Sequence, residues 1–88
     1  MMALTPDDLA VLTRLGNIAA DVQALAASAR SQWRELRVTV VDALDVRGET
    51  PVLVTAAANV FLLESDGHCW SMTTDPAAAA GLMLAARS

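Results

Sequence analysis

The sequence predicts an α+β fold made of a long N-terminal helix, an antiparallel β-meander of three or four strands and a short C-terminal helix. Three observations predict it. Apolar residues recur at helical spacing through the first third of the chain, and β-branched segments separated by turn residues fill the middle. An alanine-rich segment then follows Asp75-Pro76. With 88 residues, the chain has the length of one small domain, residues 1–88.

The first helix is predicted over residues 6–33. Thr5 can cap it, Pro6 suits the first helical position, and Asp7 lies where the helix dipole favours negative charge. Apolar residues then follow at alternating steps of four and three, which is the spacing of a heptad-like seam. The seam consists of Val11, Leu15, Ile18, Val22, Leu25 and Ala29.

The Gly16-Asn17 pair is the weak point of this helix, because glycine inside a helix costs about 1 kcal/mol relative to alanine. The pair could end one helix and cap another. The seam nevertheless continues in phase from Leu15 to Ile18. This favours a single helix that is continuous or slightly kinked.

Four segments in the middle of the chain are predicted strands, at residues 36–46, 52–56, 60–64 and 68–73. The first slips phase at Val40-Val41, which indicates a bulge or bend. Residues 56–59 form either a turn or part of a longer strand. The last helix is predicted over residues 76–86, after Asp75 as its cap.

The Asp66-Gly67 pair predicts a two-residue hairpin turn between the last two strands. Pairing around this turn places Leu63 opposite Trp70 and Phe61 opposite Met72, all on one face. We expect Trp70 to pack in the core between the sheet and a helix. The alternative is that Trp70 is an exposed anchor for a partner, since tryptophan is common at binding hot spots.

His68 and Cys69 are the only histidine and the only cysteine in the chain. Neighbours on a strand point to opposite faces, so the two cannot jointly hold a metal ion or form a nucleophile–base pair. A zinc site also needs three or four ligands. The Asp42, Asp45 and Glu49 carboxylates could bind magnesium, but a solvated strand edge and a polar turn explain them better. We therefore predict no metal, no cofactor and no enzymatic activity.

The charge and composition bear on compartment and partners. The net charge is −4, and all six basic residues are arginine, a usage typical of a GC-rich bacterial or phage genome. An acidic balance argues against a nucleic-acid partner. The lone cysteine, the lack of a signal-peptide pattern and the shortness of the apolar runs predict a cytoplasmic protein without a membrane association.

The predicted helix is about 42 Å long at 1.5 Å per residue, whereas six-residue strands span about 20 Å. A seam that overhangs its sheet is most simply buried against a second copy, so we expect a homodimer through the seam. The sequence thus predicts a non-enzymatic homodimeric protein–protein interaction module of the regulator or inhibitor kind. Its unidentified protein partner would bind through an acidic surface or at the hairpin, where the candidate residues are Asp66, His68 and Trp70.

Two alternatives stay open at this point. One is a DNA-associated regulator that contacts phosphates through Arg30, Arg34 and Arg37 near the end of the long helix. The other is a small accessory subunit of an enzyme.

Overall fold

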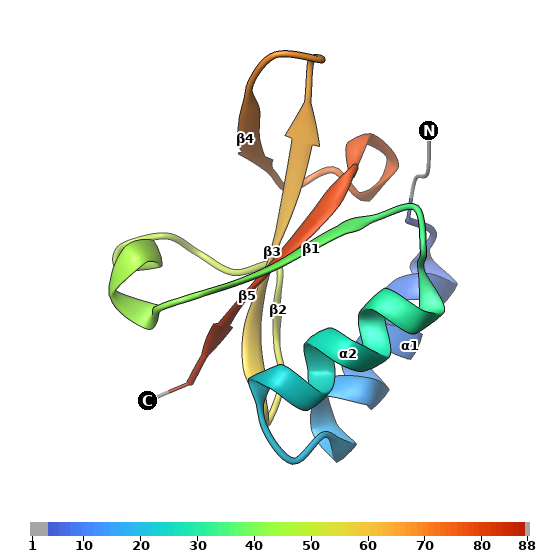
Figure 1. Cartoon of the computed structure of the whole chain (residues 1–88), viewed down its shortest axis with the longest axis vertical. Helices are drawn as coiled ribbons and strands as arrows, with labels where there is room; N and C mark the ends of the chain where they lie inside the picture. The colour runs from blue at the N-terminus through green and yellow to red at the C-terminus, as the bar shows by residue number, and fades with distance from the viewer. Residues whose placement is uncertain (1–3, 88) are drawn as a thin grey trace.

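The computed structural model describes residues 4–87, so residues 1–3 and 88 of the predicted 1–88 domain lie outside the described part. Two helices and a mixed five-stranded sheet form within it (Figure 1), which confirms the predicted α+β class. The elements in chain order are α1 (Pro6–Ile18), α2 (Val22–Gln32), β1 (Arg37–Val41), the 3₁₀ helix η1 (Ala43–Val46), β2 (Leu53–Val54), β3 (Ala58–Ser65), β4 (Trp70–Thr73), the 3₁₀ helix η2 (Pro76–Ala78) and β5 (Gly81–Ala86).

The single helix predicted over residues 6–33 is wrong, because the chain turns at residues 19–21 and starts a second helix. The Asp21 carboxylate accepts a hydrogen bond of 2.8 Å from the N–H of Ala24 and caps α2. The start of α1 is as predicted. Thr5 and Asp8 form a reciprocal capping box there, in which each side chain accepts from the other residue's N–H.

The Gly16-Asn17 pair in the last turn of α1 binds the turn between β2 and β3. The carbonyl oxygen of Gly16 accepts a 3.0 Å hydrogen bond from the N–H of Ala57. The Asn17 side chain accepts another, also of 3.0 Å, from the N–H of Ala56. These bonds hold the turn between β2 and β3 against the end of the helix, so the pair joins two parts of the fold.

The helix predicted over residues 76–86 is also wrong. Only Pro76–Ala78 forms a 3₁₀ turn, capped by Asp75, and Gly81–Ala86 is the strand β5. The sheet order is β1-β5-β3-β2, so β5 lies between β1, its parallel neighbour, and β3, its antiparallel one. A strand in this central position is buried on both faces, which explains its uninterrupted apolar sequence.

The predicted antiparallel meander is wrong, because β1 pairs in parallel with β5 and not with β2. The other strands lie at the predicted positions in the chain, with shifted ends. β1 stops at Val41 instead of residue 46, because Asp42 accepts a hydrogen bond from the N–H of Leu44 and starts η1. The prediction of 52–56 shortens to β2, 60–64 lengthens to β3, and 68–73 shortens to β4. β4 pairs with the second half of β3, on the same edge as β2.

The hairpin between β3 and β4 has a longer turn than predicted. Ser65 pairs with Trp70, and Leu63 with Met72, because residues 66–69 all belong to the turn. The register therefore differs by two residues from the predicted one. A shift of two preserves which side chains share a face, so Leu63, Trp70 and Met72 remain together.

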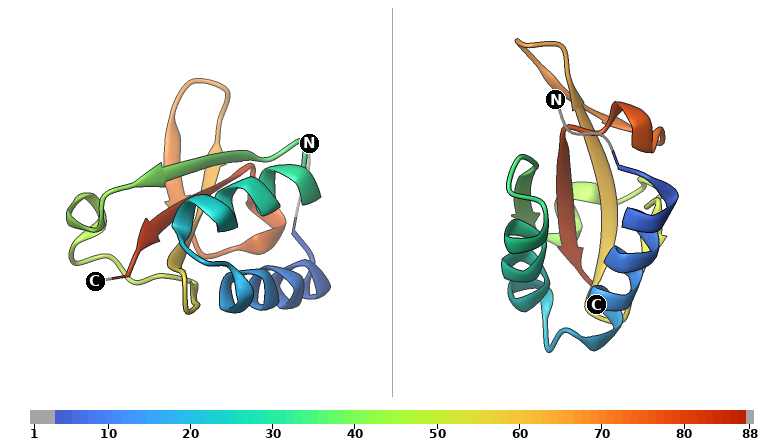
Figure 2. Two further views of the ribbon diagram at one scale, coloured as in Figure 1. Left: turned by 60° about the horizontal axis from the view of Figure 1, so that its bottom comes forward. Right: turned by 90° about the vertical axis from the view of Figure 1, so that its right-hand side faces the viewer.

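Both helices pack on one face of the sheet and bury the main core there (Figure 2). The helices contribute Leu12, Leu25, Ala26, Ala29 and Trp33, and the strands contribute alternate residues: Val38, Ala58, Val60, Leu62, Leu82 and Leu84. On the opposite face, η1 covers one end, where Val46 packs on Phe61 and Ala85. Among the described residues, no α-helix covers the rest of that face.

Candidate functional site

The face of the sheet opposite the helices carries an exposed apolar surface, which we call the open face. Alternation along the strands assigns its side chains, since residues that flank a core position point the other way. Trp70 is 44% exposed and Met72 is 39% exposed, which places both among the exposed large hydrophobic residues. Around these two exposed residues, the open face contains the half-buried residues Thr39, Val41, Leu63 and Met83, with Arg37 at its edge.

Trp70 is held on this face from two sides. The guanidinium carbon of Arg37 lies 5.5 Å from the centre of the Trp70 ring, within cation–π range. Gly81 lies beneath, where a Cβ atom would sit 3.2 Å from the Trp70 ring and 2.8 Å from the Arg37 carbonyl oxygen. The glycine thus lets the indole approach the backbone of β5 closely. The remaining surface of the ring faces solvent.

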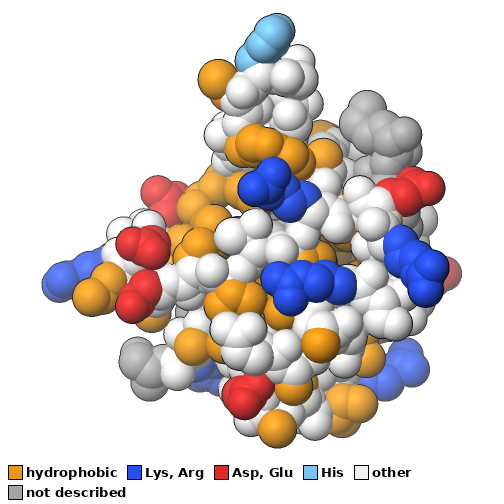
Figure 3. Space-filling view, viewed as in Figure 1, with side chains coloured by type: hydrophobic (Ala, Val, Ile, Leu, Met, Phe, Trp, Pro, Cys, Tyr) orange, Lys and Arg blue, Asp and Glu red, His pale blue; other side chains and the backbone are white. Residues whose placement is uncertain are grey.

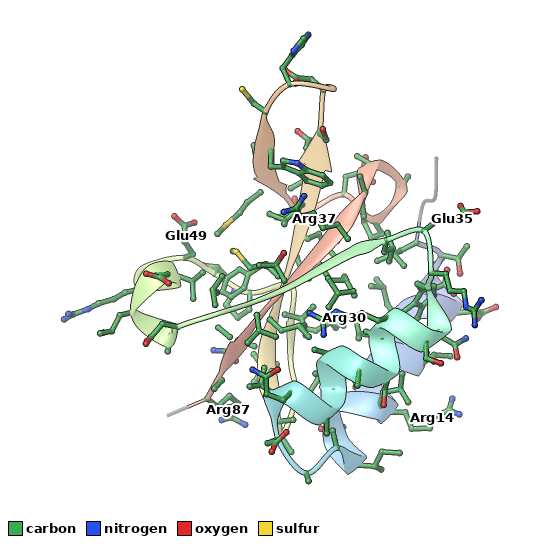
Figure 4. All side chains as sticks on the ribbon, viewed as in Figure 1. Arg14, Arg30, Glu35, Arg37, Glu49 and Arg87 are labelled. Carbon is green, nitrogen blue, oxygen red and sulfur yellow. The ribbon has the colours of Figure 1, made fainter. Side chains whose placement is uncertain are left out.

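A cleft of about 500 Å³ adjoins the open face. It lies between the loop at residues 48–52 and the end of β4, and Phe61 and Met72 form apolar parts of its wall. Glu49 also lines it. Arg37 and Glu49 lie on opposite sides of an apolar area (Figures 3 and 4), so the open face has a cation at one edge and an anion at the other.

The hairpin tip holds the other two predicted partner-binding residues, Asp66 and His68, which are exposed and separate from the centre of the open face. The N–H groups of Cys69 and His68 each donate a 2.8 Å hydrogen bond to the Asp66 carboxylate. These bonds hold the pKa of Asp66 below its ordinary value. Asp66 therefore shapes the turn, and of the three predicted residues only Trp70 belongs to the open face.

The predicted dimer seam is not a single surface in this fold. Leu25 and Ala29 are fully buried against the chain's own sheet, whereas Ile18 is 74% exposed. The other three seam residues, Val11, Leu15 and Val22, are half-buried. The overhang that motivated a homodimer through the seam disappears as well, because α1 and α2 are separate helices and α2 packs on β1 and β5.

The three arginines predicted as phosphate contacts point to different parts of the molecule. Arg30 donates a 3.1 Å hydrogen bond to the carbonyl oxygen of Val38, on the outer edge of β1. Arg34 is exposed after the end of α2, and Arg37 is on the open face (Figure 4). The structure therefore does not bring them together into one basic face.

The three acidic residues considered as magnesium ligands also do not form one site. Asp42 caps η1, while Asp45 and Glu49 are exposed. Within residues 4–87, no three histidine, cysteine, aspartate or glutamate side chains are grouped so that they could hold a metal ion. No helix in this same part of the chain has the length and apolarity needed to cross a membrane.

Sequence reasoning missed several residues of the open face. Arg37, Thr39 and Val41 could have been found from the alternation of β1, since they flank the core residues Val38 and Val40. Met83 could not, because it faces this side only when residues 81–86 are a strand. The pairing of Trp70 with a cation across the sheet depends on the same strand.

Comparison with known proteins gives a family match without a function. A family described as a family of unknown function, DUF6129, matches residues 10–87. No curated protein and no solved structure matches the chain. The matched segment contains every residue of the open face and of the adjoining cleft.

Proposed function

We propose that this chain is a non-enzymatic protein-interaction module that binds a partner through the open face. The chain belongs to DUF6129, a family of unknown function. The observation that carries the proposal is the exposure of Trp70 and Met72, two large apolar side chains of β4 on the same sheet face. Contiguous exposed apolar patches in folded proteins mark interaction sites. Tryptophan, methionine and arginine, which meet here, are also enriched at protein–protein interfaces.

The way Trp70 is supported favours a binding role. A hot-spot side chain contributes most when it is already held in its bound position, because binding then costs less side-chain entropy. Arg37 and Gly81 restrict the Trp70 ring in the free chain. The aromatic anchor is thus presented to solvent in a defined position.

The non-enzymatic part of the proposal rests on the sequence. A cysteine nucleophile requires an activating base, and the only histidine, His68, is its neighbour in the exposed hairpin turn. As part of the same proposal, the module acts in the cytoplasm of a bacterium, or of a cell infected by a phage, as a regulator or inhibitor of the kind that works by contact. The all-arginine basic set and the lone cysteine support this setting.

The test is site-specific photo-crosslinking in the native host. A photoreactive phenylalanine analogue replaces Met72 on the open face or, as a control, Gln23 on the exposed side of α2. We expect covalent adducts with a polypeptide from position 72 and not from position 23, with both variants folded by circular dichroism. Equal labelling from both positions, or no polypeptide adduct from position 72, would overturn the proposal.

A further inference from the structure

We infer that the occupant of the open face is a second copy of this chain, seated face to face about a two-fold axis that lies in the interface between Arg37 and Glu49. This inference rests on the proposed function, because it names the partner of the same surface. Its support is the distribution of charge around the apolar centre.

The two charged residues come from opposite edges of the sheet. Arg37 belongs to β1, the edge strand at one end of the order β1-β5-β3-β2. Glu49 belongs to the loop that leads into β2, and it lines the cleft beside β4 at the other end. The space-filling view shows hydrophobic side chains between a cationic and an anionic edge (Figure 3), and the stick view identifies these edges as Arg37 and Glu49 (Figure 4).

Such an arrangement is self-complementary under two-fold symmetry. A two-fold axis in the plane of the interface places the left edge of one copy over the right edge of the other. Arg37 of each copy then faces Glu49 of the other, and the apolar residues that lie between the two charges, such as Leu63, contact apolar residues of the second copy. One contact surface thereby satisfies two ion pairs and buries the exposed hydrophobic area of both copies.

The cleft gives the arginine a place to enter. Met72 and Glu49 line it, and so do the hydroxyl-bearing residues Thr50, Thr73 and Thr74. A guanidinium group prefers such oxygen acceptors, and its aliphatic stem prefers apolar walls such as Phe61. A side chain of the length and chemistry of Arg37 therefore suits the cleft.

A partner with charge of only one sign fits this face less well. A polyanion would be attracted to Arg37 and repelled at Glu49, and a basic peptide would meet the reverse. The chain's net charge of −4 further disfavours a polyanion. A second copy is matched at both edges.

The test is charge reversal followed by sedimentation equilibrium of the purified full chain. Arg37→Glu and Glu49→Arg each replace two opposite-charge pairs in the dimer by two like-charge pairs, so each should weaken dimerisation roughly tenfold or more. An equal mixture of the two variants restores both attractive pairs and should form heterodimers. The double variant should dimerise like the wild type. Arg14→Glu, which makes the same charge change on exposed α1, should leave the dimer unchanged (Figure 4).

Three results would overturn the inference. They are a wild-type mass of one chain at all concentrations, single reversals that dimerise normally, and a mixture that stays monomeric although both variants melt like the wild type. Should either reversal fail to fold, Arg37→Gln and Glu49→Gln replace the pair, and each must still weaken the dimer. A monomeric wild type whose position 72 crosslinks to another polypeptide refutes the second copy and leaves the protein-binding face standing.

Discussion

Gly16 shows how one residue sets the contact between a helix and a turn. A Cβ atom at this position would overlap the side chain of Thr55, which is buried and hydrogen-bonded to both the N–H and the carbonyl of Ala58. The sequence suggested only that glycine weakens the helix here. The structure explains the glycine, because any larger side chain at this position would overlap Thr55.

We predict that Gly16→Ala lowers the free energy of unfolding by about 1–2 kcal/mol. Overpacking a tight site costs about 1–3 kcal/mol, and the better helix propensity of alanine returns at most about 1 kcal/mol. Urea denaturation measures the difference. Ser31→Ala, at an exposed position of α2, serves as the control and should change stability by less than about 0.5 kcal/mol. A Gly16→Ala protein as stable as the wild type would contradict the contact with Thr55.

Asp8 connects the start of α1 with the end of α2. The backbone N–H of Thr5, and to a lesser degree the indole N–H of Trp33, hold the pKa of Asp8 below its ordinary value. A lowered folded-state pKa means that the carboxylate stabilises the fold above its unfolded pKa of about 3.9. This contribution is lost as the pH falls through the folded-state pKa.

Asp8→Asn should therefore melt below the wild type at neutral pH, and the gap in Tm should narrow as the pH falls below about 4. Asp7→Asn controls for the loss of a charge in the same first turn of α1. Thermal melts across the acidic range test the prediction. A gap that stays constant with pH, or an equal one for Asp7→Asn, would count against the Asp8 hydrogen bonds as its cause.

At the scale of elements, local signals in the sequence were enough to predict some structures and not others. The start of α1, the positions of β1 to β4 and the shared face of Leu63, Trp70 and Met72 followed from caps, β-branched residues and alternation. β5 did not, because a central strand apolar on both faces has no period that distinguishes it from a buried helix. Its small residues, Gly81 and Ala85, are close-packing positions under Trp70 and Val46.

This one misassignment determined what the sequence could say about the site. A C-terminal helix would have covered the hairpin and placed Trp70 in the core. With residues 81–86 in the sheet, the described residues contain no further α-helix that could cover the part of that face which η1 leaves open. The open face is thus a consequence of β5, and only the parts that belong to β1 and to the hairpin were predictable.

The two tryptophans should consequently differ in their contribution to stability. Trp33 is 2% exposed and its indole N–H donates a hydrogen bond to Asp8. Trp33→Ala should therefore lower the free energy of unfolding by about 3–5 kcal/mol. Trp70→Ala removes a half-exposed ring and one cation–π contact worth about 0.5–1 kcal/mol, so it should cost far less. Thermal melts of dilute samples compare the two variants. A Trp70→Ala protein that melts as early as Trp33→Ala would place Trp70 in the core, as the sequence first suggested.

For the whole molecule, the homodimer stays a prediction, but the expected dimer interface changes from the helical seam to the open face. Leu25 and Ala29 of the seam are buried in the chain's own core. The complete seam is therefore not available for contact with a second copy. The exposed apolar surface lies instead on the opposite layer. Its edge charges make salt a useful variable, since screening of the Arg37 and Glu49 pairs should weaken the dimer as ionic strength rises.

The most direct test of the claim that a second copy covers the open face is ¹⁹F NMR of the chain labelled with 5-fluorotryptophan. The chain has only two tryptophans, one in the core and one on the open face, so each resonance reports one environment. We predict that the Trp70 resonance, assigned by its loss in Trp70→Phe, shifts with protein concentration along the dimerisation curve while that of Trp33 stays fixed. A Trp70 resonance that keeps its position while the chain dimerises would show that the dimer does not use the open face. A chain that stays monomeric, with both tryptophan resonances unchanged on dilution, would contradict the dimer itself.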